Sequence, residues 1–88
     1  MDDDDILLAD GFEDAFIGIG HRCGQPDVAI YSIPAAIEVL MTRDHVTRED
    51  AEEYLAFNSI GAWVGTRTPV WVDLMTFAEL TDAHGVTH

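Results

Sequence analysis

The chain has 88 residues, 48% of them hydrophobic, and its 17 carboxylates against four arginines give a formal net charge of −13. This length fits one domain with a modest core, and the apolar fraction excludes a disordered chain. So large a negative charge excludes direct binding to nucleic acid or to anionic membranes, because their phosphates would repel it.

A single cysteine, Cys23, excludes an internal disulfide and any site built from several thiolates. The sequence shows no signal-peptide pattern and no apolar run long enough to cross a bilayer. We therefore expect a cytoplasmic protein with one acidic domain over residues 1–88 and flexible tails at 1–5 and 82–88. The eight aromatic residues are expected to supply most of the core.

The first part of the chain predicts one short helix. Ile6–Leu8 is an apolar run that fits either a strand or the start of a helix. Asp10 is a suitable N-cap. Apolar residues follow it at helical spacing: Phe12, Ala15, Phe16 and Ile19. We expect a helix over residues 12–19, ended early by Gly18 and Gly20.

The next segment predicts a strand followed by a buried helix. A glycine–proline turn precedes residues 28–31, which are β-branched or aromatic for the most part. Ser32 can cap a helix, and Pro34 lies near the first helical position, where its missing N–H does no harm. The helix that follows is apolar around much of its girth, a pattern typical of burial: Ile33, Ala36, Ile37, Val39, Leu40 and Met41.

Thr47 begins the clearest local pattern in the chain. Thr47 to Asp50 resembles a capping box, with aspartate in place of the usual glutamate or glutamine. Four carboxylates follow within two turns, where the helix dipole favours negative charge: Glu49, Asp50, Glu52 and Glu53. A helix over about residues 48–62 is predicted.

The last part of the chain predicts a second strand and a short helix. Thr68-Pro69 favours extended backbone before the strand at 70–72, and Asp73 can cap a helix over 73–80. With the strand at 28–31 as its neighbour, this gives an α+β fold: a small two- or three-stranded sheet with a helical hairpin packed on one face. Since a two-stranded sheet is marginal alone, a third strand or a second copy of the chain should complete it.

Two regions are candidate partner-binding sites. The four carboxylates Glu49, Asp50, Glu52 and Glu53 form an acidic cluster that favours a basic partner protein. Trp63, Arg67 and Trp71 surround a glycine-rich bend, and tryptophan and arginine are enriched in interface hot spots. Burial of the two tryptophans in the core is the competing interpretation.

Patterns that would indicate catalysis or metal binding are weak. His21 and Cys23 lack a third group to orient a nucleophile, and Glu38 is expected on the exposed face of its helix. Three residues near the C-terminus could bind a metal only in a geometry that a tail does not hold: Asp82, His84 and His88. We expect no catalytic residue, no metal and no cofactor.

Several motifs resemble a group of small uncharacterised tailed-bacteriophage proteins. They are Asp10-Gly-Phe-Glu-Asp-Ala-Phe-Ile-Gly-Ile-Gly20, Glu38-Val-Leu-Met, Thr47-x-Glu-x-Ala-x-Glu-Tyr, and Phe57-Asn-Ser-Ile-Gly-Ala-Trp-Val-Gly65 continuing to Thr68-Pro69. The resemblance covers roughly residues 10–72. It implies a phage origin and carries over no activity and no catalytic residue.

The resemblance and the charge together suggest a non-enzymatic phage accessory protein in the host cytoplasm. Small phage proteins often bind and block a host protein, here a basic one such as a defence or nucleic-acid enzyme, by offering carboxylates where the target expects phosphates. One alternative is an assembly module that forms a homodimer through the Trp63–Trp71 region. The other is a small-ligand sponge.

Overall fold

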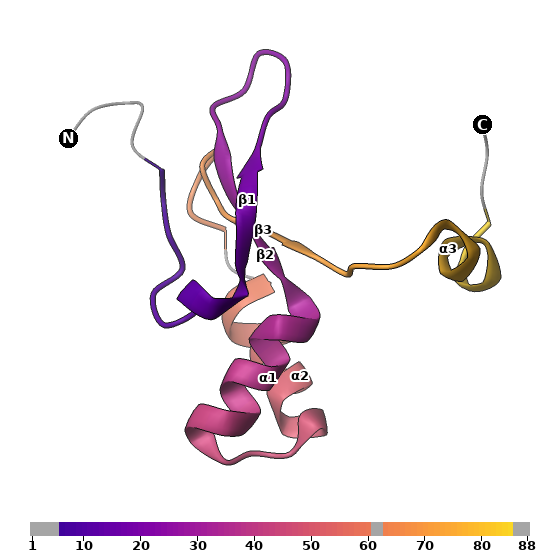
Figure 1. The fold of residues 1–88 in the computed structure, drawn as a ribbon. Coiled ribbons are helices and arrows are strands. Elements are labelled where there is room, and N and C mark those ends of the chain that lie inside the picture. The colour runs from indigo at the N-terminus through magenta and orange to yellow at the C-terminus, as the bar shows by residue number, and fades with distance from the viewer. Residues whose placement is uncertain (1–5, 61–62, 86–88) are drawn as a thin grey trace.

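The computed structural model describes residues 6–60 and 63–85, and Figure 1 shows their course. The strands are β1 (Phe16–Gly20), β2 (Val28–Ser32) and β3 (Val70–Val72). The helices are α1 (Ile33–Asp44), α2 (Arg48–Leu55) and α3 (Phe77–Ala83), with a 3₁₀ turn at Glu13–Ala15 and a π-helical turn at Ala56–Ile60. The predicted α+β class is confirmed.

The three strands form one mixed sheet in the order β1-β2-β3. β1 and β2 are antiparallel, whereas β2 and β3 are parallel, with Tyr31 opposite Trp71. The two predicted strands are therefore neighbours, as expected. The third strand is β1, and Ile6–Leu8 belongs to no strand.

The prediction of a helix over residues 12–19 is wrong. Only Glu13–Ala15 form a helical turn, and the chain then enters β1, with a bulge between Phe16 and Gly18. The segment also contains Ile17 and Ile19, which are β-branched and favour an extended chain. A Cβ atom at Gly20 would come within 2.7 Å of Ile30 Cδ1, so a larger residue there would require the Ile30 side chain to move.

α1 and α2 form an antiparallel hairpin that extends beyond the end of the sheet (Figure 1). Both predicted caps are present: Ser32 Oγ accepts a hydrogen bond from Ala35 N, and Thr47 Oγ1 accepts one from Asp50 N, each at 3.2 Å. The helix predicted over 48–62 continues through the π-helical turn to Ile60, and residues 61–62 lie outside the described residues.

The core is less aromatic than expected. Its buried members come from the first turn, β2, α1 and α2: Phe12, Ala15, Ala29, Tyr31, Ala36, Ile37, Leu40, Ala51 and Leu55. Phe12 and Tyr31 are its only aromatic members among the described residues. Phe57, Trp63 and Phe77 are exposed, at 76%, 74% and 64%.

The last helix begins later than predicted and is capped differently. Thr76, not Asp73, caps α3 in a complete capping box: Thr76 Oγ1 accepts a hydrogen bond from the Glu79 N–H, and Glu79 Oε1 accepts one from the Thr76 N–H. Figure 1 shows α3 projecting away from the sheet and the hairpin. Residues 82 and 83, expected in a flexible tail, lie in its last turn.

Candidate functional site

The acidic cluster lies on the solvent face of α2. Glu49, Asp50, Glu52 and Glu53 are all exposed, whereas Ala51 and Leu55 turn inward and are almost fully buried. The one basic residue of this helix, Arg48, pairs with Glu52 across one turn at 3.2 Å. Arg48 offsets only one of the four carboxylates, so the face of α2 stays negative.

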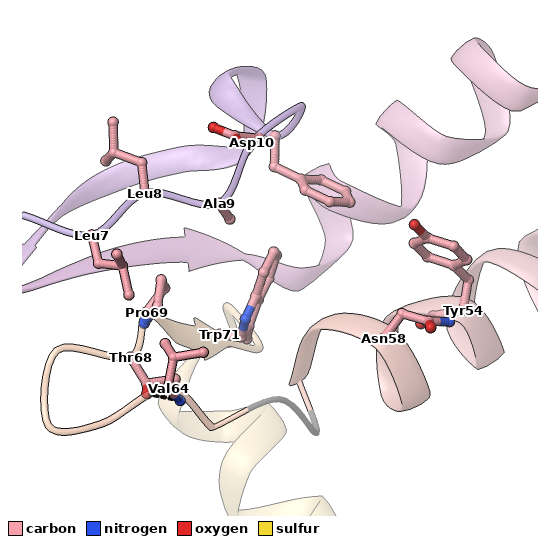
Figure 2. A pocket seen from close by; sticks show the side chains of 11 residues that line it. Leu7, Leu8, Ala9, Asp10, Tyr54, Asn58, Val64, Thr68, Pro69 and Trp71 are labelled. Carbon is pink, nitrogen blue, oxygen red and sulfur yellow. Dashed lines mark hydrogen bonds between the residues drawn. The ribbon is translucent and has the colours of Figure 1, made fainter.

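A pocket of about 410 Å³ opens beside α2 (Figure 2). Leu7–Asp10 form one wall and Tyr54 and Asn58 another. The remaining wall comes from the loop that leads into β3 and from the ring of Trp71: Val64, Thr68, Pro69 and Trp71. This volume lies within the usual range of small binding sites.

The acidic cluster and the pocket meet along one side of the helix. Asp50, Tyr54 and Asn58 follow one another at intervals of four residues, so their side chains lie in a row. Asn58, the last residue of the row, lies in the π-helical turn, and its Nδ2 donates a hydrogen bond to the carbonyl oxygen of Tyr54 at 3.2 Å. Asp50 therefore lies one turn before the pocket, and Asp10 lies on the opposite wall.

The structure separates the three residues predicted around the glycine-rich bend. Trp71 is partly buried: its ring stacks on Tyr31 with centroids 5.0 Å apart and meets Phe12 edge-on at 5.4 Å. Trp63 is exposed and borders a different hollow, and Arg67 borders a third with Asp27. Of the three, only Trp71 reaches the pocket beside α2.

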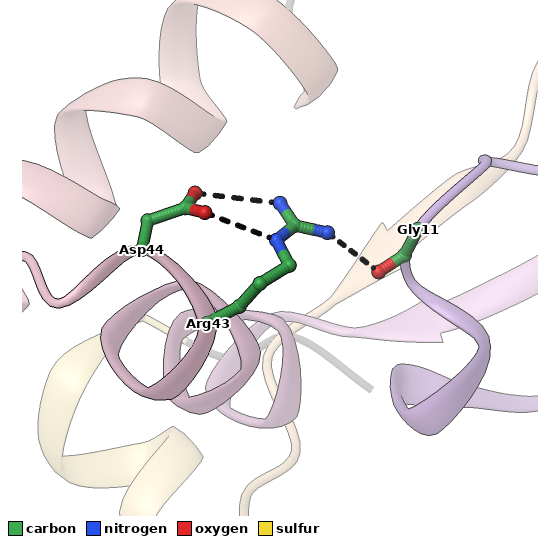
Figure 3. Close-up of polar contacts among 3 residues, drawn as sticks. All are labelled: Gly11, Arg43 and Asp44. Atoms are coloured by element: carbon green, nitrogen blue, oxygen red, sulfur yellow. Dashed lines mark hydrogen bonds and ion pairs between the residues drawn. The ribbon is translucent and has the colours of Figure 1, made fainter.

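Sequence reasoning missed the N-terminal wall of the pocket. Two long-range hydrogen bonds hold it in place: Ala9 N donates to the Tyr31 hydroxyl at 2.9 Å, and Arg43 Nη1 donates to the Gly11 carbonyl at 3.0 Å (Figure 3). The hydrogen bond from Arg43 to Asp44 raises the pKa of the guanidinium. The apolar run before Asp10 is visible in the sequence, but the sequence does not show that Tyr31 and Arg43 hold this segment in place.

The attachment through Arg43 requires a glycine-type backbone at Gly11. Gly11 has a φ of +87°, a conformation that favours glycine, and a Cβ atom there would come within 2.7 Å of Arg43 Nη1. Arg43 also lies over the ring of Phe12, with Cζ 5.5 Å from the centroid. The same arginine thus fixes the loop backbone and covers a core aromatic residue.

Replacing Tyr31 with phenylalanine is expected to loosen this wall. The variant keeps the ring stacking but leaves Ala9 N without its acceptor, so the free energy of unfolding should fall by about 0.5–1.5 kcal/mol. Urea denaturation measures that change, and hydrogen exchange should show faster exchange of the Ala9 amide. Tyr54→Phe is the matched control at an exposed position and should change stability by less than about 0.5 kcal/mol.

Among the described residues, those considered for catalysis and metal binding do not form a common site, and His88 lies outside the described residues. His21 Nδ1 lies 2.8 Å from Asp27 Oδ1, both exposed, while Cys23 is exposed in the same loop and Glu38 faces solvent. Within residues 6–60 and 63–85, no three His, Cys, Asp or Glu side chains are grouped so as to hold a metal ion. No helix in that part of the chain has the length and apolar character needed to span a bilayer.

Comparisons with protein-family models, with curated proteins and with solved structures gave no match.

Proposed function

We propose that the chain is a non-enzymatic binding protein that docks the acidic face of α2 on a basic surface of a partner protein and blocks it. One observation carries this: Glu49, Asp50, Glu52 and Glu53 are all exposed on one short helix with a single arginine among them. Such a field steers positively charged surfaces toward the helix and repels acidic ones.

The fixed backbone of α2 supports the same function. Ala51 and Leu55, almost fully buried, anchor the helix in the core, and the Thr47 cap holds its first turn. The carboxylates therefore project from a backbone already ordered before binding, which reduces the entropy lost on association. The sequence motifs resemble those of tailed-bacteriophage proteins. The proposal therefore makes the chain a phage inhibitor and its partner a host protein in the cytoplasm.

Neutralising the cluster tests the proposal. The variant Glu49→Gln, Asp50→Asn, Glu52→Gln, Glu53→Gln should bind the partner at least about tenfold more weakly, since four surface ion pairs of about 0.5 kcal/mol each are lost. The partner is first captured from bacterial lysate with the tagged wild-type chain, with and without excess duplex DNA. Its affinity is then measured in purified form.

A matched control separates the cluster from net charge. Asp14→Asn, Glu38→Gln, Asp73→Asn, Asp82→Asn removes the same number of exposed carboxylates elsewhere and should leave affinity nearly unchanged. Equal weakening by both variants would show that only total charge matters, and no weakening by the first would reject docking through α2. Displacement of the partner by DNA would support mimicry of nucleic acid.

A second candidate function, self-assembly, is favoured by the outer edge of the sheet. β1 is an edge strand without charged residues, and Phe16, Ile17 and Ile19 are 41%, 47% and 40% exposed. Open apolar edges of this kind pair readily with another strand. If two copies pair through β1, Ile17→Lys should convert a dimer into a folded monomer in sedimentation experiments. A wild-type chain that stays monomeric at high concentration would exclude this function.

A further inference from the structure

The pocket beside α2 brings together apolar side chains that nothing in the described chain covers. Leu8 is 60% exposed and Val64 is 63% exposed, yet both line the same hollow, whose remaining surface includes Pro69 and the ring of Trp71. Clustered exposed apolar groups of this kind mark binding surfaces more often than isolated ones do. A side chain placed among them would lose its contact with water, which favours binding.

The charged residues around the pocket determine which kind of segment can bind in it. Asp10 stands on one wall of the pocket, and Asp50 lies one helical turn before Tyr54 on the other. Arg43 and Arg48 are both hydrogen-bonded to carboxylates, Asp44 and Glu52. An acidic segment entering the pocket would be repelled, whereas lysines or arginines beside an apolar residue would meet opposite charge on both sides.

We infer that this pocket receives one large apolar side chain of the partner protein, from a segment in which basic residues flank that side chain. The inference rests on the proposed function and adds a specific anchor to it. The volume of about 410 Å³ has room for a side chain the size of leucine, phenylalanine or tryptophan. The apolar anchor supplies affinity and fixes the position of the segment, and the flanking cations bind the carboxylates.

A second copy of the chain fits this site poorly. Its exposed apolar side chains at the C-terminal end are Leu74, before α3, and Phe77, the first residue of α3, and the same helix carries Glu79 and Asp82. Those carboxylates would approach Asp10 in a complex between two chains that each carry a net charge of −13. Like charges across an interface disfavour association, so a basic partner is the occupant.

Selection from a library of random short peptides tests the inference with the full chain at moderate salt. We expect the enriched peptides to share a large apolar residue with lysine or arginine close to it on both sides. Replacing that apolar residue with glycine in the consensus peptide should weaken binding at least about tenfold. The acidic-cluster variant described above should weaken binding of the same peptide.

Variants in the chain locate the binding site. Val64→Glu places a charge in the pocket wall and should weaken binding of the consensus peptide at least about tenfold. Leu74→Glu adds the same charge at a position that is equally exposed, 61%, and outside the pocket, so it should bind like the wild type. Circular dichroism confirms that both variants are folded.

The outcomes distinguish the pocket from the acidic face. A consensus that is basic but has no apolar preference would overturn the inference and leave the proposed function standing. A consensus without basic residues, or no enrichment at all, would contradict the inference together with the proposed function. Equal binding by Val64→Glu and the wild type would show that the apolar residue binds elsewhere.

Discussion

Replacing Leu40 with alanine is expected to lower the free energy of unfolding by about 2–5 kcal/mol. Leu40 is 1% exposed in α1, and it belongs to the cluster in which α1 packs against Ala51 and Leu55 of α2. Alanine would leave a cavity that the two helices cannot close without moving. Since domains of this size are stabilised by only about 5–15 kcal/mol in total, the variant should lose a large part of its stability. Urea denaturation followed by circular dichroism measures the loss.

Leu74→Ala is the matched control for that experiment. Leu74 is 61% exposed and lies between β3 and α3, so its truncation should change stability by less than about 0.5 kcal/mol. Similar losses for the two leucines would contradict the packing of the helical hairpin. A loss at Leu40 alone would confirm that the hairpin holds the core together.

The second large effect is expected at Trp71. Trp71→Ala removes the ring that stacks on Tyr31 and meets Phe12 edge-on. Burial of a tryptophan in a core is worth about 3–5 kcal/mol, and because Trp71 is only partly buried we expect a loss of about 3 kcal/mol. Denaturation monitored by circular dichroism measures it. Trp63→Ala, at a position that is 74% exposed, is the control and should cost little.

This result also separates two roles of Trp71. If Trp71 served mainly to join two copies of the chain, its replacement would give a folded monomer of unchanged stability. The stacked geometry predicts the opposite, a less stable chain at every protein concentration. A stable folded monomer would therefore contradict the packing of Trp71 against the core.

Local patterns predicted the middle of the fold well. Ser32 and Thr47 cap α1 and α2 as expected, because a cap depends only on residues within one turn. The strands at 28–31 and 70–72 were also visible, since each follows a proline and is rich in β-branched or aromatic residues. These elements need no distant contact to be recognised.

Elements that depend on distant contacts were not predicted. β1 becomes a strand because it pairs with β2 along its length, from Phe16 opposite Tyr31 to Gly20 opposite Val28, whereas its own spacing suggested a helix. The start of α3, by contrast, depends on local sequence alone. Both Asp73 and Thr76 are suitable caps, and only Glu79, three residues after Thr76, distinguishes them. That signature was present in the sequence and favoured Thr76.

The candidate site was predictable only in part. The exposed carboxylates of α2 follow from the helix pattern, but the pocket does not, because its walls come from three stretches that are far apart in the sequence. The hydrogen bonds from Ala9 to Tyr31 and from Arg43 to Gly11 join residues far apart in the chain. Nothing in the spacing of these residues indicates that they meet.

The parallel pairing of β2 with β3 has a consequence for how the chain folds. It joins Ile30 to Val70, and the whole helical hairpin lies between them. The β1–β2 hairpin and the α1–α2 hairpin are each local and need only short loops to close. β3 must close a much longer loop, which costs more entropy and slows the step. During synthesis the sheet therefore stays incomplete, with one side of β2 open, until the ribosome has released residues 70–72.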